Sequence, residues 1–141
     1  MSSERLSIAD YPLAEKRPDL VVGQRGKRLE DITLRAVTEG KVILEDIRIT
    51  SAALHHQAEI ARAADRLTLA QNFDRAAELV NVPQETIMRA YEMLRPGRAT
   101  SKAELLVLAD ELRSRHSANL MAAFIEEAAE VYDLRGLLKQ R

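Results

Sequence analysis

From residue 31 onward, apolar residues recur three and four positions apart, which is the spacing of one face of an α-helix. Prolines and glycines mark where this periodicity is interrupted. The predicted helices cover residues 31–39, 51 to about 71, a short helix ending at 80, 83 to about 95, 102 to about 115, and 117 to about 135. The chain is therefore predicted to be all-α, a small helical domain of about five or six helices.

Several helix ends carry capping signals. Gly40 suits the end of the first helix, and Ser51 is the predicted N-cap of the second. Ser101 and Glu104 have the spacing of a capping box, and Ser117 is the predicted N-cap of the last helix. The residues expected to face the core are Leu54, Ala58, Ala61, Ala64 and Leu67, then Leu105, Leu108, Ala109 and Leu112, and finally Leu120, Phe124, Ala128 and Val131.

The first 30 residues differ from the rest of the chain. Pro12, Pro18, Gly23 and Gly26 interrupt every potential element there, so an irregular or extended arm is predicted. Because this N-terminal arm also holds apolar residues, it is expected either to be disordered or to lie across another surface. The predicted organisation is a single domain overall, with an arm at 1–30 and a helical region at 31–141.

Composition adds that the core is thin. Alanine accounts for 21 residues, only five residues are aromatic and there is no Trp, so little apolar area is buried per residue. Such a helical chain is expected to complete its stability against a partner. The absence of Cys excludes disulfides and Cys-based metal sites. With no secretory signal and no run of about 18 apolar residues, the protein is expected to be soluble and cytoplasmic, without a membrane partner.

Residues 72–98 have the spacing of a helix-turn-helix, with Asn81 in the turn, Pro83 at the start of the second helix and Pro96 as its stop. A DNA-binding regulator is therefore one hypothesis, in which the second helix would present its first turns to the major groove. Charge argues against it, because this segment has four arginines and four acidic residues and the chain has a net charge of -1. Nucleic-acid affinity depends mainly on neutralising phosphates, so no nucleic-acid partner is expected.

Other candidate chemistry is weak. His55 and His56 are adjacent and point about 100° apart on a helix, so they do not form a zinc site without further ligands. Gly23, Gly26 and Lys27 have the wrong spacing for a phosphate-binding loop. Glu126 and Glu130 share a helix face that is better interpreted as solvated than as an acid and base pair. No catalytic, cofactor-binding or metal-binding residue is predicted on this chain.

A set of short motifs, in shared order and spacing, carries a resemblance that covers residues 10 to about 138. The motifs are Asp10-Tyr11-Pro12-Leu13-Ala14, Leu29-x-Asp31-Ile32-Thr33-Leu34, Asp46-x-Arg48-Ile49, Gln57-Ala58-x-Ile60-Ala61, Asn72-Phe73-x-Arg75-Ala76-Ala77-Glu78-Leu79, Leu94-Arg95-Pro96-x-Arg98, Glu104-Leu105-Leu106 and Ala128-x-Glu130-Val131-Tyr132. In this order they resemble the small, or gamma, subunit of the adenosylcobalamin-dependent diol and glycerol dehydratases.

The resemblance implies a subunit without catalytic residues in a hydro-lyase. In that family the large (alpha) subunit holds the substrate and a metal ion, and adenosylcobalamin lies between the large and medium (beta) subunits. The complex, expected to be a dimer of heterotrimers, converts propane-1,2-diol or glycerol to an aldehyde and water by a radical mechanism. The resemblance leaves open which substrate is preferred, and whether the complex is free in the cytoplasm or inside a bacterial microcompartment.

The resemblance also suggests where the chain meets its partners. The arm and the apolar helix faces are expected to lie against the large subunit. The expected interface residues are Tyr11, Pro12, Leu13, Phe73, Arg95 and Tyr132. Two alternatives remain beside this hypothesis: the DNA-binding regulator described above, and a free-standing helical adaptor that would be stable without partners.

Overall fold

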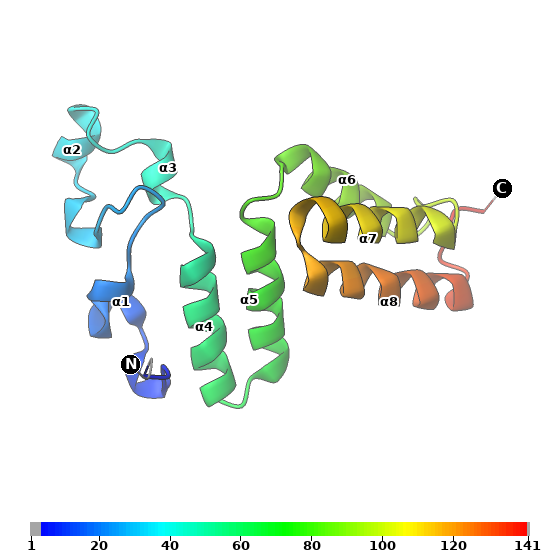
Figure 1. Cartoon of the computed structure of the whole chain (residues 1–141), viewed down its shortest axis with the longest axis horizontal. Coiled ribbons are helices and arrows are strands. Elements are labelled where there is room, and N and C mark those ends of the chain that lie inside the picture. Colours follow the sequence, from blue (N-terminus) through cyan, green and yellow to red (C-terminus); the bar gives the residue numbers. More distant parts are fainter. Residues whose placement is uncertain (1–3, 141) are drawn as a thin grey trace. The chain divides into compact units, whose positions relative to one another are not determined.

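The structure is a computed structural model that describes residues 4–140. Its α-helices are α1 (Leu13–Lys16), α2 (Leu34–Thr38), α3 (Leu44–Ile47), α4 (Ser51–Ala63), α5 (Leu67–Leu79), α6 (Gln84–Leu94), α7 (Lys102–His116) and α8 (Asn119–Arg135), shown in Figure 1. Three 3-10 helices are η1 (Ile8–Asp10), η2 (Pro18–Leu20) and η3 (Leu29–Asp31). Within residues 4–140 the only strand-like pairing is an isolated bridge between Val22 and Arg28. The all-α prediction is confirmed.

Contacts within the chain divide it into two compact units, one up to Val80 and one from Asn81 onward. None of the helices in the described part of the chain is both long and apolar enough to span a membrane.

In the first unit, α4 and α5 form a helical hairpin and lie side by side (Figure 1). Ala58, Ala61 and Ala70 are buried between them, and Phe73 packs against this cluster. Small side chains let two helix backbones approach closely, which explains how an alanine-rich sequence makes a core here. The hydroxyl of Ser51 also donates a hydrogen bond of 2.8 Å to the carbonyl of Ala77.

The prediction of a single helix from Ser51 to about Gln71 is wrong. Helix α4 ends at Ala63, and the chain reverses through Asp65, whose φ of 58° is left-handed. Leu67, expected in the core, is therefore exposed. The turn uses neither Gly nor Pro, so the apolar spacing gives no sign of it. The N-cap of α4 is Thr50 rather than Ser51, and its hydroxyl accepts from the Ala53 amide at 3.0 Å.

The described part of the arm, residues 4–30, is mostly irregular, with three one-turn helices, and it lies across α4 of its own chain. Leu6 and Leu13 are buried against Ile60 of α4. The amide of Leu6 donates a hydrogen bond of 2.9 Å to the carboxylate of Glu59. The sequence predicts that the arm is either disordered or packed across another surface. In the structure the described part is packed, and the surface belongs to the same chain.

Residues 29–49 contain only short helices. The helix predicted over 31–39 is reduced to α2, which has Thr33 as its N-cap and ends before Gly40, a glycine with a φ of 72°. Residues 42–49, which lie between two predicted helices, contain the one-turn helix α3. The helix over 31–39 is therefore shorter than the sequence predicted.

In the second unit, α7 and α8 pack against each other (Figure 1). The face predicted for α7 is confirmed, because Leu105, Leu108, Ala109 and Leu112 are all buried. The face predicted for α8 is wrong: Ala122, Ile125 and Ala129 are buried, whereas Leu120 and Phe124 are 50% and 39% exposed. Apolar residues occupy several sides of α8, so their spacing alone does not identify the buried face. The alanines on the buried face let α8 approach α7 closely.

The caps of α7 differ in part from the prediction. Ser101 is the N-cap, and its hydroxyl accepts from the Glu104 amide at 3.2 Å. The Glu104 carboxylate accepts from the amide and hydroxyl of Thr100, and these bonds lower the pKa of Glu104. Ser117, predicted as the N-cap of α8, is instead the left-handed residue that ends α7, with a φ of 53°. Ala118 precedes α8 and makes no side-chain cap.

Ion pairs tie the helices of the second unit together. Arg89 of α6 lies 2.6 Å from Glu111 of α7, and this hydrogen bond lowers the pKa of Glu111. Arg113 of α7 lies 2.5 Å from Glu126 of α8 and likewise lowers the pKa of that carboxyl. Such exposed pairs contribute little free energy each, so the core of α7 and α8 provides most of the stability.

Candidate subunit interface

A tight turn at residues 23–27 fits against α3. The amide of Gly23 donates to the Lys27 carbonyl at 2.8 Å, and the amide of Gly26 donates to the Gly23 carbonyl at 3.0 Å. A Cβ atom at Gly23 would collide with the backbone carbonyl oxygen of Asp46. Gly23 therefore permits close backbone approach, which is a structural role for a glycine pair that only partly resembled a phosphate-binding loop.

Asp46 of α3 is the one buried charged residue of the part of the chain that the structure describes. Its Oδ2 accepts from the Ile43 amide at 2.8 Å and from the Arg25 guanidinium at 3.2 Å. Gln24 donates a further hydrogen bond of 3.1 Å to the Ile49 carbonyl. These bonds fix the turn at 23–27 to the segment from Ile43 to Ile49. The bonds to Asp46 also help to offset the hydration that its carboxylate loses on burial.

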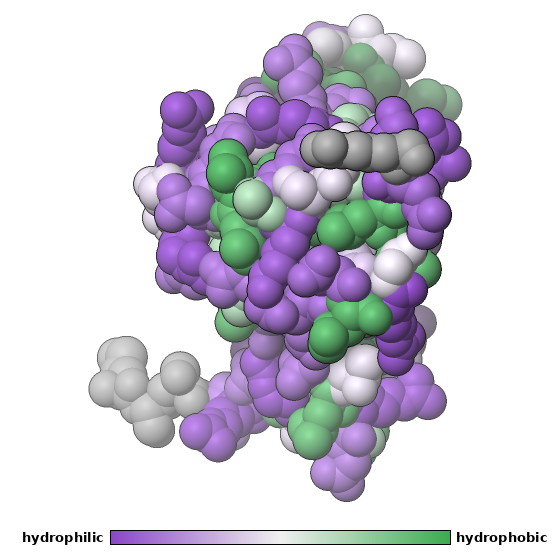
Figure 2. All heavy atoms as spheres, turned by 90° about the vertical axis from the view of Figure 1, so that its right-hand side faces the viewer, coloured by the Kyte–Doolittle hydropathy of each residue, from purple (hydrophilic) through white to green (hydrophobic). Residues whose placement is uncertain are grey.

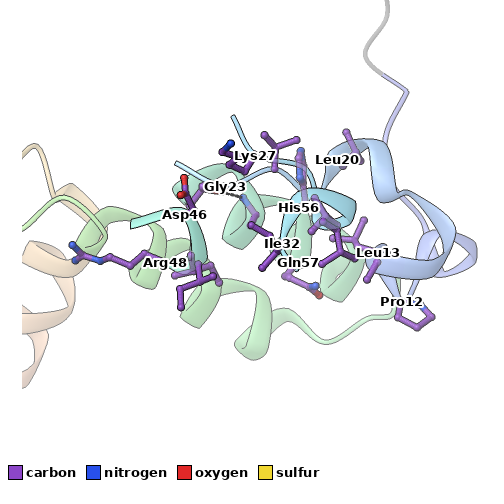
Figure 3. Close-up of a pocket in the computed structure, with 18 of the residues that line it drawn as sticks. Pro12, Leu13, Leu20, Gly23, Lys27, Ile32, Asp46, Arg48, His56 and Gln57 are labelled. Carbon is purple, nitrogen blue, oxygen red and sulfur yellow. Dashed lines mark hydrogen bonds between the residues drawn. The ribbon is translucent and has the colours of Figure 1, made fainter. Parts of the chain in front are cut away.

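An open pocket of about 600 Å³ lies between the arm, α3 and the start of α4 (Figure 3). Its lining is mostly apolar, a composition typical of binding surfaces. The lining residues are Tyr11, Pro12, Leu13, Ala14, Leu20, Val21, Val22, Gly23, Lys27, Leu29, Ile32, Asp46, Ile47, Arg48, Ile49, Thr50, Ala53, His56 and Gln57. We call this the arm pocket.

Beside the arm pocket, seven large apolar side chains are exposed within residues 29–49. Leu34 is 80% exposed, Leu44 73% and Ile47 61%, and the others are Leu29, Val37, Ile43 and Ile49. We call these seven residues the apolar row. Exposed apolar side chains concentrated in one segment are typical of a surface that contacts another protein.

The second unit also exposes seven large apolar side chains, but they are spread over three helices: Met88 and Tyr91 of α6, Leu106 and Val107 of α7, and Leu120, Phe124 and Leu134 of α8. On the face shown in Figure 2, apolar residues form small patches separated by hydrophilic ones. Scattered patches of this kind are normal on a soluble surface and indicate no particular partner.

The structure brings three of the six expected interface residues together. Tyr11, Pro12 and Leu13 all line the arm pocket, where Tyr11 is 60% exposed and Leu13 is buried against Ile60. Tyr11 is therefore the member of this group that is most accessible to a partner.

The other three expected interface residues lie elsewhere. Phe73 packs in the α4–α5 hairpin. Arg95 is exposed and pairs with Glu92 at 3.2 Å. Tyr132 of α8 is half-buried, and its hydroxyl donates to the carbonyl of Leu94, next to Arg95.

Sequence reasoning missed the apolar row. Its signal in the sequence is the dense run Val42, Ile43, Leu44, Ile47 and Ile49, of which all but the buried Val42 belong to the row. These residues lie between two predicted helices, and no helix is predicted for them. Only the structure establishes that most of these side chains face outward.

The weak chemical candidates have ordinary partners. His55 lies 3.1 Å from Asp74, which also pairs with Arg62 at 2.5 Å. Glu126 and Glu130 are held in ion pairs with Arg113 and Lys102. Within residues 4–140 no three His, Cys, Asp or Glu side chains are grouped as metal ligands would be.

The helix-turn-helix hypothesis is also not favoured. Its two helices, α5 and α6, belong to different compact units. Arg89, in the first two turns of α6, is paired with Glu111. Asn81, expected in the turn, does not adopt the left-handed geometry of positive φ. Pro83 is the N-cap residue that precedes α6.

Comparison with known proteins identifies the family. Residues 6–139 match the family described as dehydratase small subunit. The chain is 47% identical over 138 residues to the propanediol dehydratase small subunit of Citrobacter freundii, covering 98% of this chain and 80% of that relative. It is also 47% identical to the propanediol dehydratase small subunit of Salmonella typhimurium, covering 98% and 79%. The resemblance carried by the motifs is confirmed, and the chain belongs to the dehydratase small subunit family.

Proposed function

We propose that this chain is the non-catalytic small subunit of a coenzyme B12-dependent dehydratase that converts 1,2-diols or glycerol to aldehydes and water. The observation that carries the proposal is the family match over residues 6–139, together with two relatives named as propanediol dehydratase small subunits. The apolar row supports it, because an enzyme subunit needs a surface that other subunits cover.

Adenosylcobalamin and the metal ion are assigned to partner subunits in this proposal. Within residues 4–140 no three His, Cys, Asp or Glu side chains are grouped as the ligands of a metal ion would be. No step of the reaction is therefore assigned to a side chain of this subunit.

Its contribution is structural. A cofactor that performs radical chemistry must be held in an oriented, water-poor site, and the protein supplies that restraint. A helical subunit can stabilise the subunits that hold the cofactor without placing any group near the reacting atoms. The proposed partners are a large and a medium subunit, assembled as a dimer of heterotrimers.

The proposed interface includes the six residues named from the resemblance. Tyr11 and Arg95 are exposed and are available for direct contact. Leu13, Phe73 and Tyr132 are packed in their own chain, so their proposed part is to hold neighbouring exposed residues in place. The complex is placed in the cytoplasm, and packaging in a bacterial microcompartment is compatible with the proposal.

Co-expression tests this function. The tagged chain, produced together with the large and medium subunits, is expected to co-purify with both and to give a complex with cobalamin-dependent dehydratase activity. Omitting the chain should lower the yield or activity of the complex. Fully active large and medium subunits that never bind this chain would contradict the proposal.

A further inference from the structure

The apolar row lies in a segment that buries little of its own surface. Helix α2 contains no buried residue, and in α3 only Asp46 is buried. Helices of four or five residues are not stable by themselves, so the segment depends on contacts made around it. The turn at 23–27 supplies some of these through Arg25 and Gln24, yet the seven side chains of the apolar row remain exposed.

The arm pocket makes this surface concave. Leu29, Ile47 and Ile49 of the apolar row also line the arm pocket, and Tyr11 borders it from the arm. A concave apolar surface next to exposed apolar side chains is the shape that receives an anchoring side chain from another protein. The pocket and the row therefore form one continuous candidate surface within the first unit.

Charge indicates what kind of segment fits there. The charged residues that line the arm pocket are Lys27, Arg48 and Asp46. The Asp46 carboxylate is fully buried and bonded to Arg25, whereas Lys27 and Arg48 have no ion-pair partner among residues 4–140. Figure 3 shows Arg48 extending away from the other labelled residues. Two unpaired cations at the border of an apolar pocket are complementary to carboxylates on a partner.

We propose that the arm pocket and the apolar row are the docking surface for an acidic, apolar segment of a partner dehydratase subunit. An apolar side chain of that segment enters the arm pocket, and neighbouring carboxylates pair with Lys27 and Arg48. The inference rests on the proposed function, since it needs partner subunits, and it adds which surface is used and which chemistry the partner presents.

Charge reversal is the first test. The double variant Lys27→Glu with Arg48→Glu changes residues on the border of the arm pocket. The control, Arg115→Glu with Lys139→Glu, makes the same change in net charge on the second unit. At low ionic strength the pocket variant is expected to raise the Kd for the complex of large and medium subunits at least about tenfold. The difference should shrink in high salt, and the control should bind like the wild type.

Removal of an apolar contact is the second test. Ile47→Gln changes a side chain of the apolar row that is 61% exposed, and Leu134→Gln changes one that is 84% exposed in the second unit. Because both are exposed, neither substitution should impair folding of the free chain. Ile47→Gln is expected to weaken partner binding by about tenfold, the order expected when a buried apolar side chain is lost. Leu134→Gln should have little effect.

The outcomes separate the inference from the proposed function. A wild-type chain that binds neither partner subunit would overturn both. Wild-type binding that is unchanged in the Lys27/Arg48 variant and in Ile47→Gln would overturn the inference and leave the proposed function standing. A chain that forms homodimers by these same residues in analytical ultracentrifugation would also overturn it. If circular dichroism shows that the double variant is unfolded, Ile47→Gln decides alone.

Discussion

At the scale of single residues, the positions that matter most are those that let segments approach each other. Gly23 has no Cβ, so the turn at 23–27 can lie against the backbone of Asp46. Asp46 then accepts hydrogen bonds from Ile43 and Arg25 inside this contact. Neither residue is a catalytic group. Together they hold one wall of the arm pocket, and this explains why the chain has a glycine and a buried carboxylate there.

Substitution of Gly23 tests this interpretation. Gly23→Ala places a methyl group against the Asp46 carbonyl, and overpacking of this kind is expected to lower the free energy of unfolding by about 1–3 kcal/mol. Urea denaturation followed by circular dichroism would measure it. Gly26→Asn is the matched control, because Gly26 has open space around it and Asn tolerates its positive φ of 81°. A Gly23→Ala chain as stable as the control would show that the close approach is unimportant.

At the scale of elements, both long helical pairs pack through small residues. The α4–α5 hairpin buries Ala58, Ala61 and Ala70, and α8 presents Ala122, Ile125 and Ala129 to its core. The alanine content that suggested a thin core therefore has a second consequence, which is close contact between helices. The helix junctions are made by left-handed residues that are not glycine, at Asp65 and Ser117.

The junction between α7 and α8 gives a prediction that separates two roles for Ser117. As a left-handed residue, Ser117 is strained relative to glycine, so Ser117→Gly is expected to raise the free energy of unfolding by about 0.5 kcal/mol. As an N-cap, the same change would lower it by a few tenths. Ser101→Ala, at the N-cap of α7, is the comparison and should lower stability by about 1 kcal/mol. Thermal or urea denaturation measures all three proteins, and a loss of stability in Ser117→Gly would contradict the structure.

At the scale of the whole molecule, the chain folds into two compact units and leaves the apolar row exposed on the first. Large apolar side chains in water favour association, so a chain of this kind is expected to gain stability from its complex. The sequence likewise predicts a helical protein that completes its stability against a partner. Dependence on a partner would distinguish an enzyme subunit from a free-standing adaptor.

Binding should therefore raise the thermal stability of this chain. A partner complex at one hundred times its Kd stabilises the bound fold by about 2.7 kcal/mol, which corresponds to a melting temperature several degrees higher. Fluorescence of a hydrophobic dye on the apolar row should fall as the complex forms. Differential scanning fluorimetry and a dye titration measure these effects. A free chain that is as stable as the complex and binds no dye would favour the adaptor instead.

The sequence by itself determined the fold class, the positions of most long helices and the family. Apolar residues at helical spacing indicate the buried face of a helix whatever that face packs against. The helix α7 and its buried leucines could therefore be predicted from spacing alone. The family followed from the order of motifs along the chain, and that order does not depend on packing. The assignment of Tyr11, Pro12 and Leu13 to a subunit interface stays a prediction.

Only the tertiary structure decided where the helical pairs turn, which face of α8 is buried and which apolar residues remain exposed. Asp65 and Ser117 adopt left-handed geometry because packing of the adjoining helices requires it. Their residue types alone do not predict this geometry. In α8, apolar residues occupy several faces, so contact with α7 selected the one that is buried. Burial depends on what surrounds a side chain, and for this reason the arm pocket and the apolar row became visible only when distant segments were brought together.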